Sequence, residues 1–203
     1  MTQDYYKLCL NFFKGEPEKY STDEFIQKLF FLYPSLKVDL DLLHKINRQI
    51  SSVLDIPYHD IKVIGSSHTG FSFIDKERTG TVKFYNTAEP SDIDIAIIND
   101  SIFIDILEKT VIRTENYSDN TAFKNANLLQ YFKKNIPSGF IRPDSIGCEV
   151  TRAKWVRFFS DLSNEHNLKI SGAIYLNETF FIKRLKKQIE TFQNIEEVQN
   201  GIK

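Results

Sequence analysis

The sequence has little of several features that define whole classes of proteins. It has only two cysteines, Cys9 and Cys148, which lie far apart and therefore argue against a disulfide framework or a cysteine zinc site. No apolar stretch is long enough to cross a membrane, and the first residues, Met1 to Asp4, lack the basic and apolar parts of a signal peptide. We therefore expect a cytoplasmic protein without a membrane segment.

An excess of positive charge is also lacking. Lysine and arginine number 26 against 27 aspartate and glutamate residues, which gives a net charge of -1. Affinity for a polyanion usually comes with a broad positive field. The composition therefore argues against a dedicated nucleic-acid-binding protein and leaves only a local basic patch open.

The remaining composition is that of a globular protein with an aromatic-rich core. The 203 residues are 41% apolar and 26% charged, and they include 17 Phe and 9 Tyr. This length suits one domain with a proper core. We expect a single domain with an N-terminal helical extension over residues 1–38, a core over 39–193 and a polar tail over 194–203.

Helical signals dominate the beginning of the chain. Apolar residues recur at helical spacing over residues 3–14, which predicts a first helix. Ser21 and Glu24 have the spacing of a capping box, which predicts a second helix that ends at Tyr33. An aspartate is expected to cap a third helix over residues 39–54. The first two helices form the extension, where we expect a possible docking site for a partner protein.

The clearest chemical pattern lies in residues 91–98. Alternation along a strand places Asp92 and Asp94 on one face and the intervening isoleucines on the other. Two carboxylates held side by side repel each other, which favours a compensating cation. Mg²⁺ is usually held by one or two carboxylates together with water and substrate phosphates. Asp92 and Asp94 are therefore candidate metal ligands; the alternative is that Asp92 ends the strand and Asp94 is only solvated.

A loop rich in small residues precedes this pattern. An apolar strand over residues 61–64 runs into Gly65, Ser66 and Ser67. Glycine lets backbone approach a ligand closely, and successive amide hydrogens with serine hydroxyls favour an anion such as phosphate. His68 in the same loop would either contact phosphate when protonated or face solvent. The alternative is an ordinary strand-to-loop turn, which uses the same residue types.

The two patterns together suggest a family. Residues 63–66, Val-Ile-Gly-Ser, and residues 91–95, Ser-Asp-Ile-Asp-Ile, resemble the signature of the DNA polymerase beta-like nucleotidyltransferase superfamily. The resemblance implies an α+β nucleotidyltransferase fold, with a small mixed sheet and helices packed on it. It also implies transfer of a nucleoside monophosphate from a nucleoside triphosphate to an acceptor, with two Mg²⁺ ions. The acceptor, whether nucleic acid, protein or small molecule, is not identified by the sequence.

The resemblance also assigns roles to particular residues. It implies that Gly65 and Ser66, with Ser67 beside them, contact the triphosphate. Asp92 and Asp94 correspond to the carboxylates that hold the metal ions.

The chain departs from the family pattern by an insertion between the loop and the acidic pair. Residues 71–74 and 81–85 alternate in polarity around a polar stretch, 75–80, which predicts a hairpin that could line the nucleotide site. A Gly-Phe-Ser after the loop and a long insert resemble bacterial nucleotidyltransferase-like domains found in antiviral defence operons.

The second departure concerns a third acid, which active members usually carry on a later strand. The strand predicted over residues 168–175 has no carboxylate. Asp144 and Glu149 are the remaining candidates, each with a solvated surface carboxylate as the alternative. Without a third acid the chain would be an inactive nucleotidyltransferase-like module that binds nucleotide or a partner protein.

The rest of the chain alternates helices with short strands. Periodicity predicts helices over residues 102–109, 118–134, 151–165 and 177–192, and a short strand over 139–144. Cations on the last two helices could reach substrate phosphates, and the alternative is a solvated helix face. They include Arg152, Lys154, Arg157 and, in the final helix, Lys187.

Overall fold

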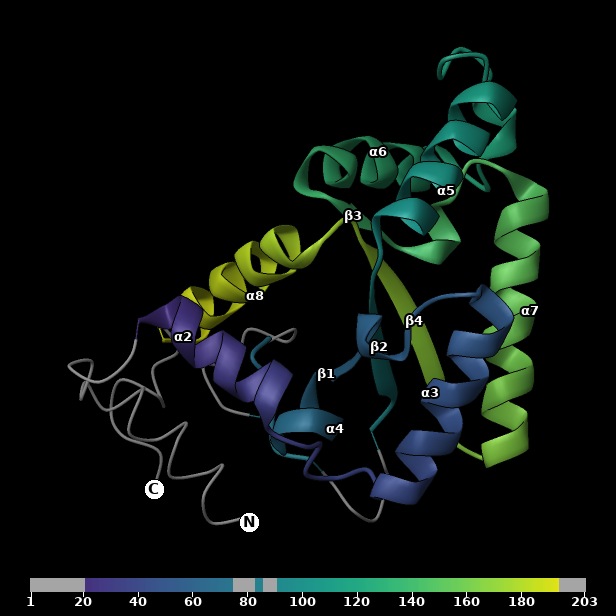
Figure 1. The fold of residues 1–203 in the computed structure, drawn as a ribbon. Helices are drawn as coiled ribbons and strands as arrows, with labels where there is room; N and C mark the ends of the chain where they lie inside the picture. Colours follow the sequence, from purple (N-terminus) through teal and green to yellow (C-terminus); the bar gives the residue numbers. More distant parts are fainter. Residues whose placement is uncertain (1–20, 75–82, 86–90, 194–203) are drawn as a thin grey trace. The chain divides into compact units, whose positions relative to one another are not determined.

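The computed structural model describes residues 21–74, 83–85 and 91–193. These residues form a four-stranded mixed sheet and seven α-helices, which confirms the predicted α+β class (Figure 1). None of the helices in this described part combines the length and the apolar character that a membrane span requires.

The elements follow one another in the order that the sequence periodicity predicts for most of the chain. The helices are α2 (Thr22–Gln27), α3 (Leu40–Leu54), α4 (Ser66–Thr69), α5 (Asp100–Arg113), α6 (Ala126–Asn135), α7 (Glu149–His166) and α8 (Glu178–Gln193). The strands are β1 (Ile61–Ile64), β2 (Ile93–Ile98), β3 (Phe140–Ile141) and β4 (Ile170–Tyr175).

The sheet has the strand order β1-β2-β4-β3. The last two strands are antiparallel, with Phe140 opposite Tyr175 and Ile141 opposite Ile174. Strand β2 is an inner strand, and its run of β-branched residues suits a position that is covered on both faces.

Contacts divide the chain into two compact units. Unit 1 comprises residues 1–45, 63–93 and 182–203, and unit 2 comprises residues 46–62 and 94–181.

Unit 1 contains helix α2 and its continuation. Ser21 Oγ accepts a hydrogen bond from Glu24 N at 3.2 Å and Glu24 Oε2 accepts one from Ser21 N at 2.7 Å, so the predicted capping box is confirmed. The helix continues as a π-helical turn, η1 (Lys28–Leu32), and ends at Tyr33 as predicted. Four apolar side chains of this segment are buried, whereas Leu32 is 77% exposed, and the docking of a partner protein here stays a prediction; the buried ones are Phe25, Ile26, Leu29 and Phe30. The first predicted helix, over residues 3–14, lies outside the described residues.

The insertion contributes to the core of unit 1. Phe71 and Phe84 form an antiparallel bridge, which agrees with the predicted hairpin, although the described residues form no full strand there and residues 75–82 lie outside them. Phe71 and Phe73 are each 5% exposed, and their ring centroids lie 5.5 and 5.2 Å from that of Phe192 in α8. These two side chains therefore fill the core rather than line a nucleotide site.

In unit 2, α3 and α7 lie side by side (Figure 1). Gln49 of α3 donates to Glu165 Oε1 at 2.7 Å, and its Oε1 lies 2.9 Å from His166 Nε2. Helix α7 also covers β4, because Gly172 has no side chain and leaves room for the ring of Phe159.

The helix predicted over residues 118–134 is shorter in the structure. Asp119 Oδ1 accepts from Thr121 N and begins a 3₁₀ turn, and Asn125 Oδ1 accepts from Leu128 N and begins α6. Two residues that favour helix N-caps compete in this segment, and the second one sets the start of the helix.

Candidate functional site

The two predicted metal ligands lie at the start of the inner strand β2. Ile93, Ile95 and Ile97 are 4%, 1% and 0% exposed, whereas Asp92 and Asp94 are half-buried. Within β2 the half-buried Asp94 alternates with the buried residues Ile93 and Ile95, Ala96 is buried as well, and Asp92 directly precedes the strand. The core thus fixes the strand from which the acids project.

A serine of the neighbouring strand fixes one of these carboxylates. Ser171 Oγ in β4 donates a hydrogen bond to Asp94 Oδ1 at 2.8 Å. Strand β4 lies next to β2 in the sheet, so Ser171 occupies the place beside Asp94 on the neighbouring strand. The sequence analysis missed Ser171; its only signal was a polar residue near the start of a strand.

The donor set at this position suits a hard divalent cation. Asp92 and Asp94 supply carboxylate oxygens, and Mg²⁺ commonly takes no more than two carboxylates from the protein because phosphates and water complete its shell. Among the residues that the structure describes, no group of three or more His, Cys, Asp or Glu side chains could hold a metal by itself.

The Gly-Ser loop is a single turn of helix that follows β1. Gly65 has φ +72° and ψ -162°, a backbone conformation that favours glycine. Its carbonyl accepts hydrogen bonds from His68 N and Thr69 N, both at 3.1 Å, which closes the turn. Ser66 is half-buried at the first position of α4.

Ser67, which was predicted to contact phosphate, instead holds the loop in place. The residue is fully buried, and its hydroxyl donates to Ile64 O at 3.3 Å. Its carbonyl accepts from Ser35 Oγ at 2.7 Å and from Lys37 N at 3.1 Å. We therefore retain Gly65 and Ser66, but not Ser67, as candidate phosphate contacts.

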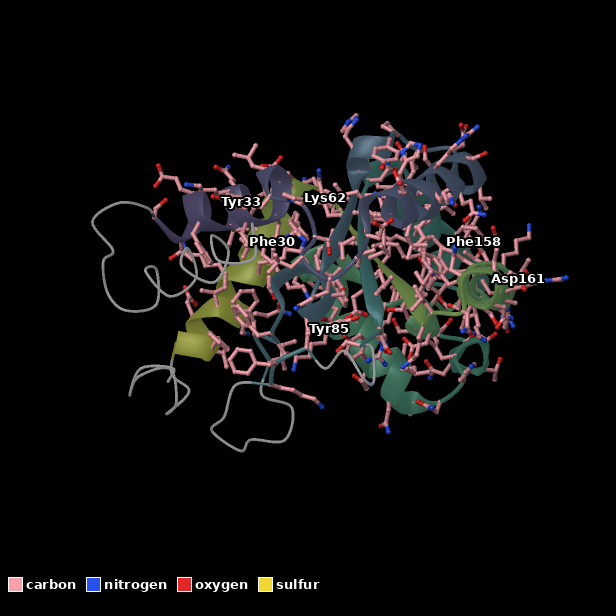
Figure 2. The ribbon with its side chains drawn as sticks, turned by 90° about the horizontal axis from the view of Figure 1, so that it is seen from below. Phe30, Tyr33, Lys62, Tyr85, Phe158 and Asp161 are labelled. Atoms are coloured by element: carbon pink, nitrogen blue, oxygen red, sulfur yellow. The ribbon has the colours of Figure 1, made fainter. Side chains whose placement is uncertain are left out.

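His68 is also structural, so the expectation that it contacts phosphate or faces solvent was wrong. Its side chain is buried, its Nε2 donates to Leu29 O at 2.7 Å, and its ring stacks on Phe30 with centroids 4.9 Å apart. Phe30 is labelled in Figure 2. The N-terminal extension therefore supports the loop directly, through Leu29 and Phe30.

This burial predicts an acid-sensitive fold. Burial lowers the pKa of His68 to about 4, against a smaller opposing effect of the hydrogen bond to Leu29. Because the unfolded histidine has a pKa near 6.5, the unfolded chain binds more protons, and the stability contributed by neutral His68 is lost as the pH falls from 6.5 toward 4. Between pH 7 and pH 5 the free energy of unfolding should fall by about 2 kcal/mol more in the wild type than in His68→Gln. Urea denaturation over this pH range measures the difference, and parallel curves for the two proteins would contradict the prediction.

The structure does not bring the predicted third acid to the metal ligands. Asp144 lies in the turn after β3, and β4 separates β3 from β2. Its Oδ1 accepts from Arg142 Nε at 2.5 Å, and both side chains are exposed. Glu149, the other candidate, binds Arg113 through both carboxylate oxygens. Each acid is therefore held by an arginine.

The cations predicted to reach phosphate have different surroundings. Arg152 is buried, and its Nη1 donates to the carbonyls of Ala122 and Ile146, so its role is to hold backbone. Arg157 pairs with Asp161 on the exposed side of α7. Lys187 is exposed on α8, in unit 1.

Comparison of the sequence with protein-family models, with curated proteins and with solved structures found no match. The resemblance to nucleotidyltransferases therefore depends on the residues of the loop and of β2 themselves.

Proposed function

We propose that this chain is a magnesium-dependent nucleotidyltransferase, which moves a nucleoside monophosphate from a nucleoside triphosphate to an acceptor and releases pyrophosphate. The observation that carries the proposal is the position of Asp92 and Asp94. Asp94 alternates with the buried residues Ile93 and Ile95 in β2, Asp92 directly precedes the strand, and Ser171 donates a hydrogen bond to Asp94. A structural role alone does not require two neighbouring carboxylates on an inner strand.

The proposal gives each residue a separate task. Asp92 and Asp94 hold Mg²⁺, which when bound neutralises negative charge on the phosphates and on the leaving pyrophosphate. The backbone and hydroxyl of Gly65 and Ser66 bind the β and γ phosphates; the positive φ of Gly65 suits a residue without a side chain, which lets backbone approach a ligand closely. Ser171 donates to Asp94 and thereby limits the rotation of its carboxylate.

The hydrogen bond from Ser171 to Asp94 also favours a second candidate function. The strand beside β2 presents a hydroxyl, not a carboxylate, to Asp94. Such a site would bind a metal and a nucleoside triphosphate without transferring anything, and the chain would then act as a nucleotide-binding module.

The discriminating experiment measures transfer and binding on the same protein. The chain is incubated with Mg²⁺ and each α-labelled nucleoside triphosphate, alone and with RNA, protein or small-molecule acceptors. The transferase proposal expects label in a product and release of pyrophosphate. Binding of the magnesium triphosphate complex without label in any product would support the binding module and reject transfer.

Substitution of Ser171 by aspartate tests the basis of the second candidate. A carboxylate at residue 171 would lie beside Asp94 and add a third ligand for Mg²⁺. If the wild type binds nucleotide but transfers nothing, we expect Ser171→Asp to tighten Mg²⁺ binding by about tenfold, because an added carboxylate contributes charge at short range. Isothermal titration with Mg²⁺ measures this, and Ser171→Asn is the uncharged control. Equal affinities for both variants would contradict the assignment of this position to the metal.

A further inference from the structure

Unit 2 contains a cavity of about 530 Å³, whose lining includes Lys154 but none of the proposed metal and phosphate contacts Gly65, Ser66, Asp92 and Asp94. It lies among α3, α5 and α7, and all the residues around it belong to unit 2. Small-molecule sites typically occupy about 300–1,000 Å³. The cavity therefore has the size of a ligand site.

Helices α5 and α7 each line this cavity with one stripe of side chains. On α5 the lining residues have the spacing i, i+3, i+4 and i+7, and the same spacing recurs on α7. They are Ile102, Asp105, Ile106 and Lys109 on α5, and Thr151, Lys154, Trp155 and Phe158 on α7. Figure 2 labels Phe158, together with Asp161 on the same helix.

Most of the lining is apolar, and part of it remains accessible to solvent. Val53 at the end of α3 is 59% exposed and Val150 at the start of α7 is 65% exposed, whereas Trp155 is 7% exposed. Because Val53 and Val150 are exposed near the buried ring of Trp155, they offer an apolar surface that a ligand can cover.

The charges at the rim are not balanced. Lys109 is neutralised by Asp105, whose carboxylate lies 2.6 Å from its ammonium. Lys154 is exposed, and in the described part of the chain its ammonium forms no hydrogen bond or ion pair. Glu149 at the same end of α7 is already bound by Arg113. One cation is therefore left to face a ligand.

We propose that this cavity binds an amphipathic carboxylate, a small molecule with an apolar body and a single anionic head. The apolar body lies against Trp155, Phe158 and Val150, and the head pairs with Lys154. The first turn of the 18-residue helix α7 adds a favourable field for the anion, because Thr151 and Val150 lie at its N-terminal end. This ligand is chemically distinct from a nucleoside triphosphate, so the proposal is independent of the nucleotidyltransferase assignment.

The chain carries its own reporter for this site, because Trp155 is its single tryptophan. The probes are decanoate, used below its micelle concentration, and decanol as the uncharged molecule of the same chain length. We expect decanoate to shift and saturate the fluorescence of Trp155, and decanol to bind at least about fivefold more weakly, because it cannot pair with the lysine. A second measurement uses Cys148, which lines the cavity. In the variant Cys9→Ser, Cys148 is the remaining thiol, and saturating decanoate should slow its labelling by maleimide.

Two cation substitutions on α7 give a matched test of the head-group contact. Lys154→Met is expected to weaken decanoate about fivefold and leave decanol unchanged. Arg157→Met removes a cation that lies one position outside the lining set and pairs with Asp161, and it should change neither ligand. Val150→Asp, at an exposed lining position that tolerates a polar side chain, should weaken both ligands.

Four results would overturn the proposal. The first is no saturable change with decanoate, and the second is equal binding of decanoate and decanol to the wild type. The third is an equal loss of decanoate binding in Lys154→Met and Arg157→Met, which would indicate only a general effect of net charge. A change of Trp155 fluorescence that depends on protein concentration and not on decanoate would assign this surface to contact between copies of the chain, and would likewise reject the ligand site.

Discussion

Replacement of Asp94 by asparagine is expected to reduce magnesium-dependent transfer from α-labelled triphosphate at least about a hundredfold, since a metal ion contributes several kcal/mol to such a reaction. The substitution keeps the size of the side chain and an oxygen that can still accept from Ser171, so the strand should stay in place. What it removes is the negative charge that Mg²⁺ requires. Label incorporation and Mg²⁺ titration are measured on the same preparation.

Two further carboxylate variants make this result specific. Asp92→Asn should cause a loss of similar size, because the proposal assigns both acids to Mg²⁺. Asp161→Asn, at a position on α7 where the side chain is 69% exposed, should leave transfer unchanged. If the wild type labels no acceptor and nucleotide binding survives Asp94→Asn, the transferase proposal fails.

Replacement of Gly172 by alanine is expected to lower the free energy of unfolding by about 2–3 kcal/mol, in the range of overpacking a core. A Cβ atom at this position would lie 2.2 Å from Phe159 Cζ and 2.8 Å from its Cε1 and Cε2 atoms. The ring cannot move away easily, because it is 5% exposed and stacks on Trp155 with centroids 5.5 Å apart. Urea denaturation of the wild type and the variant measures the cost.

The double variant with Phe159→Leu shows whether this contact is the cause. Leucine lacks the ring atoms that the new methyl group would meet, so the two substitutions together should cost less than the sum of their separate effects. Strict additivity would mean that Gly172 is required for a reason other than the room it gives to Phe159.

The element boundaries that the sequence predicted well are those with a local signal. Ser21 and Asp39 each accept a hydrogen bond from a free amide in the first turn of a helix, and both helices begin where these residues indicate. Such interactions involve residues a few positions apart and depend little on the rest of the fold. The segment before α6 was harder to predict because Asp119 and Asn125 are both good caps, and only packing selects the second as the start of the helix.

For the candidate site, too, the sequence predicted the features that depend on neighbouring residues and missed the others. The sequence by itself determined that Asp94 alternates with the buried residues Ile93 and Ile95, because the alternation of a strand is a property of its own backbone. It also indicated Gly65, since a sharp turn after a strand calls for a residue that tolerates positive φ. Which side chains surround these residues could not be deduced from the sequence.

Only the tertiary structure decided which residues lie beside them. Ser171 is 77 positions away from Asp94 and reaches it because β4 pairs next to β2, and His68 is buried because Leu29 and Phe30 cover it. The cavity likewise arises where faces of α5 and α7, each an ordinary amphipathic pattern in the sequence, lie together. Periodicity and capping depend on neighbours along the chain, whereas burial, strand order and cavities depend on packing between distant segments, which no local pattern specifies.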